Sequence, residues 1–157
     1  MGELHFETTD QGHLPAGADV TAVLAAGGDV ALSAVWSTYN YRQFLRGLID
    51  NAGRGDTDAE RQRSASELPM LRAEIDALAE VTALQALEAN RRLTELLVGR
   101  RWMVMRDARE AGESWTTIGT ALGMSKQGAL DWYKRKIANQ ENSMLHDADR
   151  ARAVVTE

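Results

Sequence analysis

The chain has 157 residues, a net charge of −5 and no cysteine, which excludes disulfides, thiolate metal sites and cysteine nucleophiles. No apolar run approaches the ~18 residues that cross a membrane, and the polar, acidic residues 1–10 lack the pattern of a secretory signal. The sequence therefore predicts a cytoplasmic protein with no membrane contact.

The first 65 residues are expected to contain a leader and a helical region. Residues 1–18 are polar, contain glycines and a proline and show no periodicity, which predicts a flexible leader. Residues 19–65 form the N-terminal helical region. A short helix is predicted over 19–26, stopped by two glycines, and a second over 30–51, capped by Asp29 and followed by a glycine-rich, acidic break.

A long helix is predicted over residues 66–98, with Ser66 as its cap and Pro69 in its first turn. Three apolar residues have the spacing of a coiled-coil seam: Leu71, Ile75 and Leu78. The later leucines drift from that register, which favours a pair or bundle of helices over one unbroken seam. We expect the leucine-rich stretch 71–97 to be the contact of a homodimer.

Residues 99–140 are predicted to form a trihelical domain with a helix-turn-helix, followed by a polar tail, 141–157, which extends the last helix or frays. Residues at the helix ends and crossing have the types that two closely packed helices need: Gly112, Ser114, Gly119, Gly123 and Ser125. The expected inward residues are Ile118, Ala121, Leu122, Ala129, Trp132, Tyr133 and Ile137. The expected outer face of the last helix comprises Lys126, Gln127, Leu130, Asp131, Lys134 and Arg135.

This outer face has the chemistry of duplex-DNA recognition. A recognition helix presents its first residues to base edges in the major groove. The amide of Gln127 can pair with adenine, and Lys126 can donate to guanine or to a phosphate. Lys134 and Arg135 lie two turns further on, in reach of the DNA backbone. The candidate DNA-binding residues, including two threonines suited to a phosphate at the start of a helix, are Thr116, Thr117, Ser125, Lys126, Gln127, Gly128, Asp131, Lys134 and Arg135.

Positive charge is concentrated in the same segment. Residues 91–137 hold 10 Lys and Arg against 5 Asp and Glu, whereas residues 1–90 hold 6 against 14 and residues 138–157 hold 2 against 4. A basic segment in an otherwise acidic chain confines a polyanion to one face. Four arginines before the motif either extend that basic surface or form an ordinary solvated face: Arg100, Arg101, Arg106 and Arg109.

Residues 90–137 resemble the helix-turn-helix regulators common in actinobacteria and, more distantly, region 4 of sigma factors. The resemblance lies in Arg109-Glu-Ala-Gly and in Trp115-x-x-Ile118-Gly-x-x-Leu122-Gly-Met-Ser-Lys-Gln-Gly-Ala. It implies a trihelical DNA-binding domain. Two positions depart from the pattern: Gly128 replaces the usual alanine, and Asp131 puts a negative charge on a face that approaches phosphate. Asp131 either accepts from a cytosine amine or pairs with Arg135.

Other interpretations stay open. A helix pair with a glycine turn also occurs in purely structural bundles, and the acidic N-terminal helices can serve a protein-interaction module such as an adaptor, an antitoxin-like partner or a sigma-like accessory factor. Four aromatic residues belong either to the core or to a partner surface: Trp36, Tyr39, Tyr41 and Phe44. His5, His13 and His146 are too scattered for a metal site. We expect an all-α DNA-binding protein, nucleoid-associated, without catalytic residues, metal or cofactor.

Overall fold

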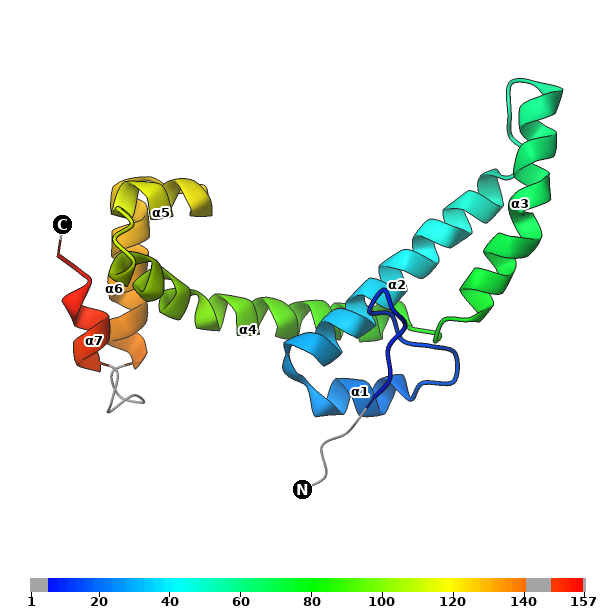
Figure 1. The fold of residues 1–157 in the computed structure, drawn as a ribbon. Coiled ribbons are helices and arrows are strands. Elements are labelled where there is room, and N and C mark those ends of the chain that lie inside the picture. Colours follow the sequence, from blue (N-terminus) through cyan, green and yellow to red (C-terminus); the bar gives the residue numbers. More distant parts are fainter. Residues whose placement is uncertain (1–5, 141–147, 157) are drawn as a thin grey trace. The chain divides into compact units, whose positions relative to one another are not determined.

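A computed structural model describes residues 6–140 and 148–156 (Figure 1). The described residues form helices joined by turns and loops, and no strand, which confirms the prediction of an all-α fold. In chain order the helices are α1 (Val20–Ala26), α2 (Gly28–Asn51), α3 (Asp58–Asp76), α4 (Ala83–Glu110), α5 (Trp115–Leu122), α6 (Lys126–Gln140) and α7 (Ala148–Ala153). None of them, within the described ranges, is long and apolar enough to cross a membrane. The chain divides into two compact units, Met1–Leu96 and Leu97–Glu157.

The core of the first unit lies between α1, α2 and the beginning of α4. Its buried residues include Val20, Val23, Leu24, Ala31, Leu32, Ala34, Val35, Ala86 and Ala89. The carboxylate of Asp19 caps α1 by accepting from the Ala22 N–H at 3.0 Å. Gly27, at a φ of 68°, ends α1 and begins α2, so Asp29 lies in the first turn of α2 rather than at its cap. The two predicted helices exist, but the predicted cap is wrong.

Residues 6–18, predicted as a flexible leader, pack onto this core, so that prediction is wrong for the part described. Leu14 is fully buried, and its N–H donates to the hydroxyl of Thr38 at 2.8 Å. The Ala79 N–H donates to the Leu14 carbonyl at 2.9 Å, and the Ala16 N–H donates to the Ala77 carbonyl at 2.8 Å. These partners are distant in the chain, which is why no local pattern revealed them.

Replacing Thr38 by valine is expected to destabilise the first unit by about 2 kcal/mol, because the buried Leu14 N–H loses its acceptor while the volume stays similar. Denaturant unfolding followed by far-ultraviolet circular dichroism measures the change. Thr94→Val is the control, since Thr94 is exposed on α4 and its substitution should change stability by less than about 0.5 kcal/mol. Equal losses in the two variants would contradict a special role for Thr38.

The predicted long helix over 66–98 is instead parts of two helices. A capping box starts α3 early, because the Thr57 hydroxyl accepts from the Glu60 N–H while the Glu60 carboxylate accepts from the Thr57 N–H. Pro69 lies inside α3 rather than in a first turn, and the hydroxyl of Ser66 donates to the Arg63 carbonyl instead of capping a helix.

Residues 77–82 separate α3 from α4, and a buried arginine of α2 holds this break. The guanidinium of Arg42 donates to the carbonyls of Ile75 and Leu78 at 2.8 and 2.9 Å. Leu71 and Leu78 are buried with Leu45, and Ile75 packs beside them. The predicted seam is therefore used within the chain, between α2 and α3, which lie side by side in Figure 1.

The second unit is built from the end of α4 with α5, α6 and α7. Its buried residues are Trp102, Met105, Trp115, Ile118, Ala129, Leu130, Tyr133, Ile137 and Ala151. Residues 148–156 thus contribute to the core, whereas the sequence predicted only a polar tail; residues 141–147 lie outside the described part. Arg109 donates to the carbonyls of Val154 and Thr156, and Arg150 forms a two-pronged hydrogen bond with Glu110.

Tyr133 links α6 to α7. Its hydroxyl donates to the Ala151 carbonyl at 2.8 Å, and its burial raises the pKa of the hydroxyl to about 12. Because the folded pKa exceeds the ordinary value of 10, the associated stability is fully present below pH 10 and is lost as pH rises towards 12.

Tyr133→Phe is expected to cost about 1 kcal/mol at pH 7, through the unpaired Ala151 carbonyl. The same variant should lose less stability than the wild type between pH 10 and pH 12, because it has no hydroxyl to ionise there. Urea unfolding at stepped pH measures the difference between the two proteins. A difference that does not shrink with rising pH would rule out the buried hydroxyl as the cause.

Candidate nucleic-acid interface

Helices α5 and α6 are joined by a tight turn over residues 123–125, and local hydrogen bonds define it. The Ser114 hydroxyl accepts from the Thr117 N–H at 3.0 Å and caps α5. Gly123 is left-handed, with a φ of 66°. The Ser125 hydroxyl accepts from the Gly128 N–H at 3.0 Å at the start of α6. The predicted caps and turn conformation are confirmed.

Gly119 allows α5 to approach the turn closely. A Cβ atom at this position would lie 2.8 Å from the carbonyl oxygen of Met124 and 3.0 Å from that of Ser125. Both neighbours are backbone atoms of the turn, so neither can rotate away as a side chain would. The packing of α5 on α6 therefore depends on the absence of a side chain here, as the sequence predicted.

The buried stripe of α6 consists of Ala129, Leu130, Tyr133 and Ile137. Leu130 was predicted on the outer face, and this is wrong: only 2% of it is exposed, because it follows the same helical spacing as Tyr133 and Ile137. Trp132 is half-buried, with the guanidinium of Arg101 5.3 Å from its ring centroid. On α5, Ala121 is exposed, whereas the apolar pattern placed it inside.

The remaining predicted residues of α6 form one exposed face: Lys126, Gln127, Asp131, Lys134 and Arg135. Among the residues that the structure describes, Lys126, Lys134 and Arg135 form no ion pair, and each extends a cation to solvent. Thr116 and Thr117 are exposed at the start of α5, where the Thr117 hydroxyl shares a 2.9 Å hydrogen bond with that of Ser114. The structure therefore places a cationic surface on α6.

Asp131 pairs with Gln127. A pair with Arg135, which was one of the two alternatives predicted from the sequence, is not formed within the described part of the chain. The Gln127 Nε2 atom donates to the Asp131 Oδ1 atom at 2.7 Å. Gly128 lies between them in sequence, and a Cβ atom there would lie 3.1 Å from the Ser125 hydroxyl. An alanine at 128 would therefore make a tight contact with the side chain that caps α6.

Two of the four arginines that precede the motif, Arg106 and Arg109, stabilise the second unit. Arg106 is 6% exposed, forms an ion pair with Asp107 and lies 5.4 Å from the Trp102 ring centroid. Arg109 lies 5.5 Å from the Trp115 ring centroid and donates to three backbone carbonyls, those of Glu113, Val154 and Thr156. Sequence reasoning missed these roles, because most of the partners are tryptophan rings and distant carbonyls.

The aromatic residues of α2 divide between core and surface. Trp36 and Tyr39 pack against the core of the first unit, and Tyr41 packs against the cluster of Leu45, Leu71 and Leu78. Tyr41 also stacks with His13, at 4.6 Å between ring centroids, and with Phe44, which is 59% exposed. The Tyr41 hydroxyl donates to Glu74, and this hydrogen bond raises its pKa. Burial lowers the pKa of His13, against the opposing charge of Glu74. His13 therefore belongs to an aromatic stack.

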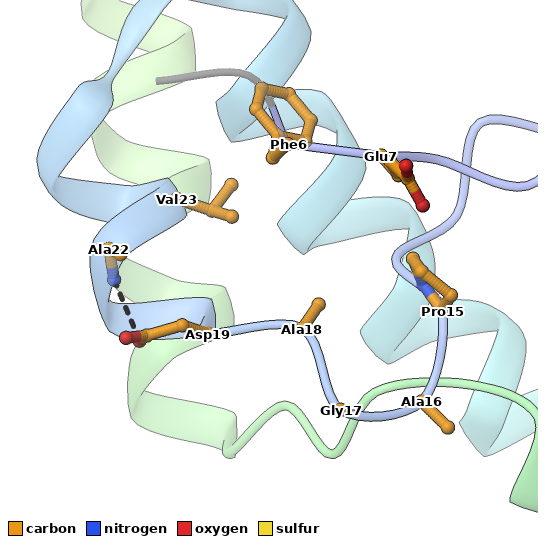
Figure 2. Close-up of a pocket in the computed structure, with 9 residues that line it drawn as sticks. All are labelled: Phe6, Glu7, Pro15, Ala16, Gly17, Ala18, Asp19, Ala22 and Val23. Atoms are coloured by element: carbon orange, nitrogen blue, oxygen red, sulfur yellow. Dashed lines mark hydrogen bonds between the residues drawn. The ribbon is translucent and has the colours of Figure 1, made fainter. Parts of the chain in front are cut away.

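A pocket of about 340 Å³ lies in the first unit, between the segment 6–7, the loop before α1 and α1 itself (Figure 2). Its lining residues are Phe6, Glu7, Pro15, Ala16, Gly17, Ala18, Asp19, Ala22 and Val23. The ionisable groups are two carboxylates, and that of Asp19 already caps α1. The pocket brings no acid–base pair or nucleophile together, so the exposed face of α6 is the better candidate site.

Comparisons with protein-family models, with curated proteins and with solved structures found no match for this chain.

Proposed function

We propose that residues 99–140 bind duplex DNA as a helix-turn-helix and that the protein is a sequence-specific transcriptional regulator, acting as a homodimer at the nucleoid. The observation that carries the proposal is the exposed face of α6, with Lys126, Lys134 and Arg135 on a helix whose opposite stripe is fully buried. A rigid helix with cations on its outer face and polar side chains at its start has the chemistry that the major groove accepts.

The contacts divide into two kinds. Lys134 and Arg135 serve the phosphate backbone together with Thr116 and Thr117, and fix the position of α6 on the duplex. Lys126 and Gln127, in the first turn of α6, face the base edges, while the hydroxyl of Ser125 is engaged in the cap.

A homodimer provides two such faces, because one recognition helix has a small footprint and two half-sites about one helical turn apart raise specificity. Within the stretch 71–97, Leu71 of α3 and Leu78 of the following break are buried inside the chain. Three leucines of α4 are available for a partner: Leu84, Leu87 and Leu97 are 78%, 61% and 55% exposed. Sedimentation should therefore show a dimer, which Leu84→Ser with Leu87→Ser converts to a monomer. A stable wild-type monomer, with and without DNA, would contradict this part.

A second candidate function is a protein-interaction module in the first unit. The observation that favours it is the exposure of Phe44 and Met70, at 59% and 63%, on two neighbouring helices. In this case a partner captured from the source cell would be lost with Phe44→Ser and Met70→Ser, and duplex DNA would bind weakly and without sequence preference.

Selection from random duplex DNA tests the proposal directly. The wild type should enrich paired half-sites, and Gln127→Ala and Lys126→Ala should lose preference at individual positions of the half-site, because those side chains face the bases. A bidentate side-chain–base pair contributes about 1–3 kcal/mol of discrimination, so the loss at one position should be about tenfold or more. Failure to enrich any sequence, together with no retarded band on random duplex at low salt, would overturn the proposal.

A further inference from the structure

We propose that Asp131 determines the base specificity of α6, by orienting the Gln127 amide for adenine and by disfavouring guanine. The inference rests on the proposed binding of duplex DNA. It starts from one contact: Nε2 of Gln127 donates to Oδ1 of Asp131 at 2.7 Å, between two exposed side chains one helical turn apart.

The contact fixes which way the amide faces. A glutamine amide has an acceptor oxygen on one side and a nitrogen with two hydrogens on the other, whereas an ionised carboxylate only accepts. Rotating the Gln127 amide by half a turn would place its oxygen against the oxygen of Asp131, which is repulsive. Asp131 therefore keeps the Nε2 atom of Gln127 facing its carboxylate and the Oε1 atom facing away from it.

The oriented amide keeps the groups that adenine needs. One hydrogen of Nε2 is used by Asp131, and the second hydrogen and the Oε1 atom stay free for a base. Adenine presents the N7 acceptor and the N6 amino donor in the major groove, and a glutamine amide pairs with both. Because the amide is oriented before binding, less side-chain freedom is lost when the pair forms.

The oriented amide of Gln127 does not match guanine. Its major-groove edge carries two acceptors, N7 and O6, so one of them would face the Oε1 atom of the oriented amide. The carboxylate beside the amide adds a negative charge near those acceptors. The same carboxylate lowers affinity for any duplex, since it approaches phosphate. Asp131 should therefore raise discrimination and lower general affinity, two effects of opposite sign.

The test uses the duplex selected by the full-length wild type, at the position whose preference Gln127→Ala abolishes. Duplexes with adenine, 7-deazaadenine or guanine there are titrated with wild type, Asp131→Ala and Asp131→Asn. Wild type should prefer adenine over guanine about tenfold or more, the discrimination of one bidentate pair. The preference should fall with 7-deazaadenine, which lacks N7, and Gln127→Ala should not distinguish the two adenines.

Asp131→Ala should lower the adenine preference about tenfold, to the level of Gln127→Ala, while binding to random duplex rises several-fold. Asp131→Asn keeps an acceptor without the charge, so we expect an intermediate preference. Glu113→Gln removes the same charge from an exposed residue outside α6 and should leave the preference unchanged. A purely structural role would lower affinity for all duplexes together.

The outcomes separate the two proposals. An unchanged adenine preference in Asp131→Ala, with binding intact, overturns this inference alone, as does a parallel loss of preference and general affinity. An Asp131→Asn variant with full wild-type preference overturns the part assigned to charge. The absence of salt-dependent duplex binding by the wild type overturns the proposed function itself.

Discussion

Replacing Gly119 by alanine should destabilise the second unit by about 3 kcal/mol, at the upper end of what overpacking costs, because the new Cβ atom meets backbone that cannot move independently. The carbonyl oxygens of Met124 and Ser125 would lie 2.8 and 3.0 Å from it. To make room, α5 must shift away from the turn, and Ile118, buried beside it, would lose contacts. Duplex binding should weaken with the folded fraction.

Denaturant unfolding followed by tryptophan fluorescence measures the loss. A Trp36→Phe background restricts the signal to Trp102, Trp115 and Trp132, all in the second unit. Gly99→Ala is a matched control, because Gly99 lies inside α4 with nothing near its Cβ position. That substitution should stabilise the unit by about 0.5–1 kcal/mol, since alanine favours helix. Changes of the same sign in both variants would contradict the role assigned to Gly119.

The features that sequence predicted correctly are those decided within a few residues. The caps at Ser114 and Ser125 and the left-handed turn at Gly123 each depend on a partner no more than four positions away. Helical periodicity also placed most of the exposed face of α6. The prediction failed at Leu130, which was grouped with the polar residues although it follows the same helical spacing as the buried Tyr133 and Ile137.

The features that sequence missed depend on distant partners. The break at residues 77–82 has no glycine or proline, and the carbonyls that it frees are bonded by Arg42, 33 and 36 residues away from Ile75 and Leu78. Leu14 is likewise held by Thr38, 24 residues away. In the sequence Arg109 resembles any surface cation, because the Val154 and Thr156 carbonyls that it bonds are 45 and 47 residues away.

Removing the three exposed cations of α6 together should nearly abolish duplex binding at physiological salt. Each cation–phosphate contact adds about 1 to the steepness of log affinity against log salt. The triple variant Lys126→Ala, Lys134→Ala and Arg135→Ala removes the two phosphate contacts of Lys134 and Arg135, so it should lower that steepness by about 2. Hydrogen bonds to charged groups contribute about 1.5 kcal/mol or more each, so affinity should fall by more than a hundredfold. The fold should be unaffected, because all three side chains are exposed.

The control removes as much charge from the other unit. Arg46, Arg63 and Arg72 are exposed on α2 and α3, and their replacement by alanine makes the chain equally more acidic. Electrophoretic retardation at several salt concentrations compares the two triple variants. If binding depended on net charge alone, they would lose affinity equally. A loss of duplex affinity in the α6 variant alone would show that binding depends on the face of α6 and not on net charge. This is expected for a chain whose 23 acidic residues outnumber its 18 basic ones.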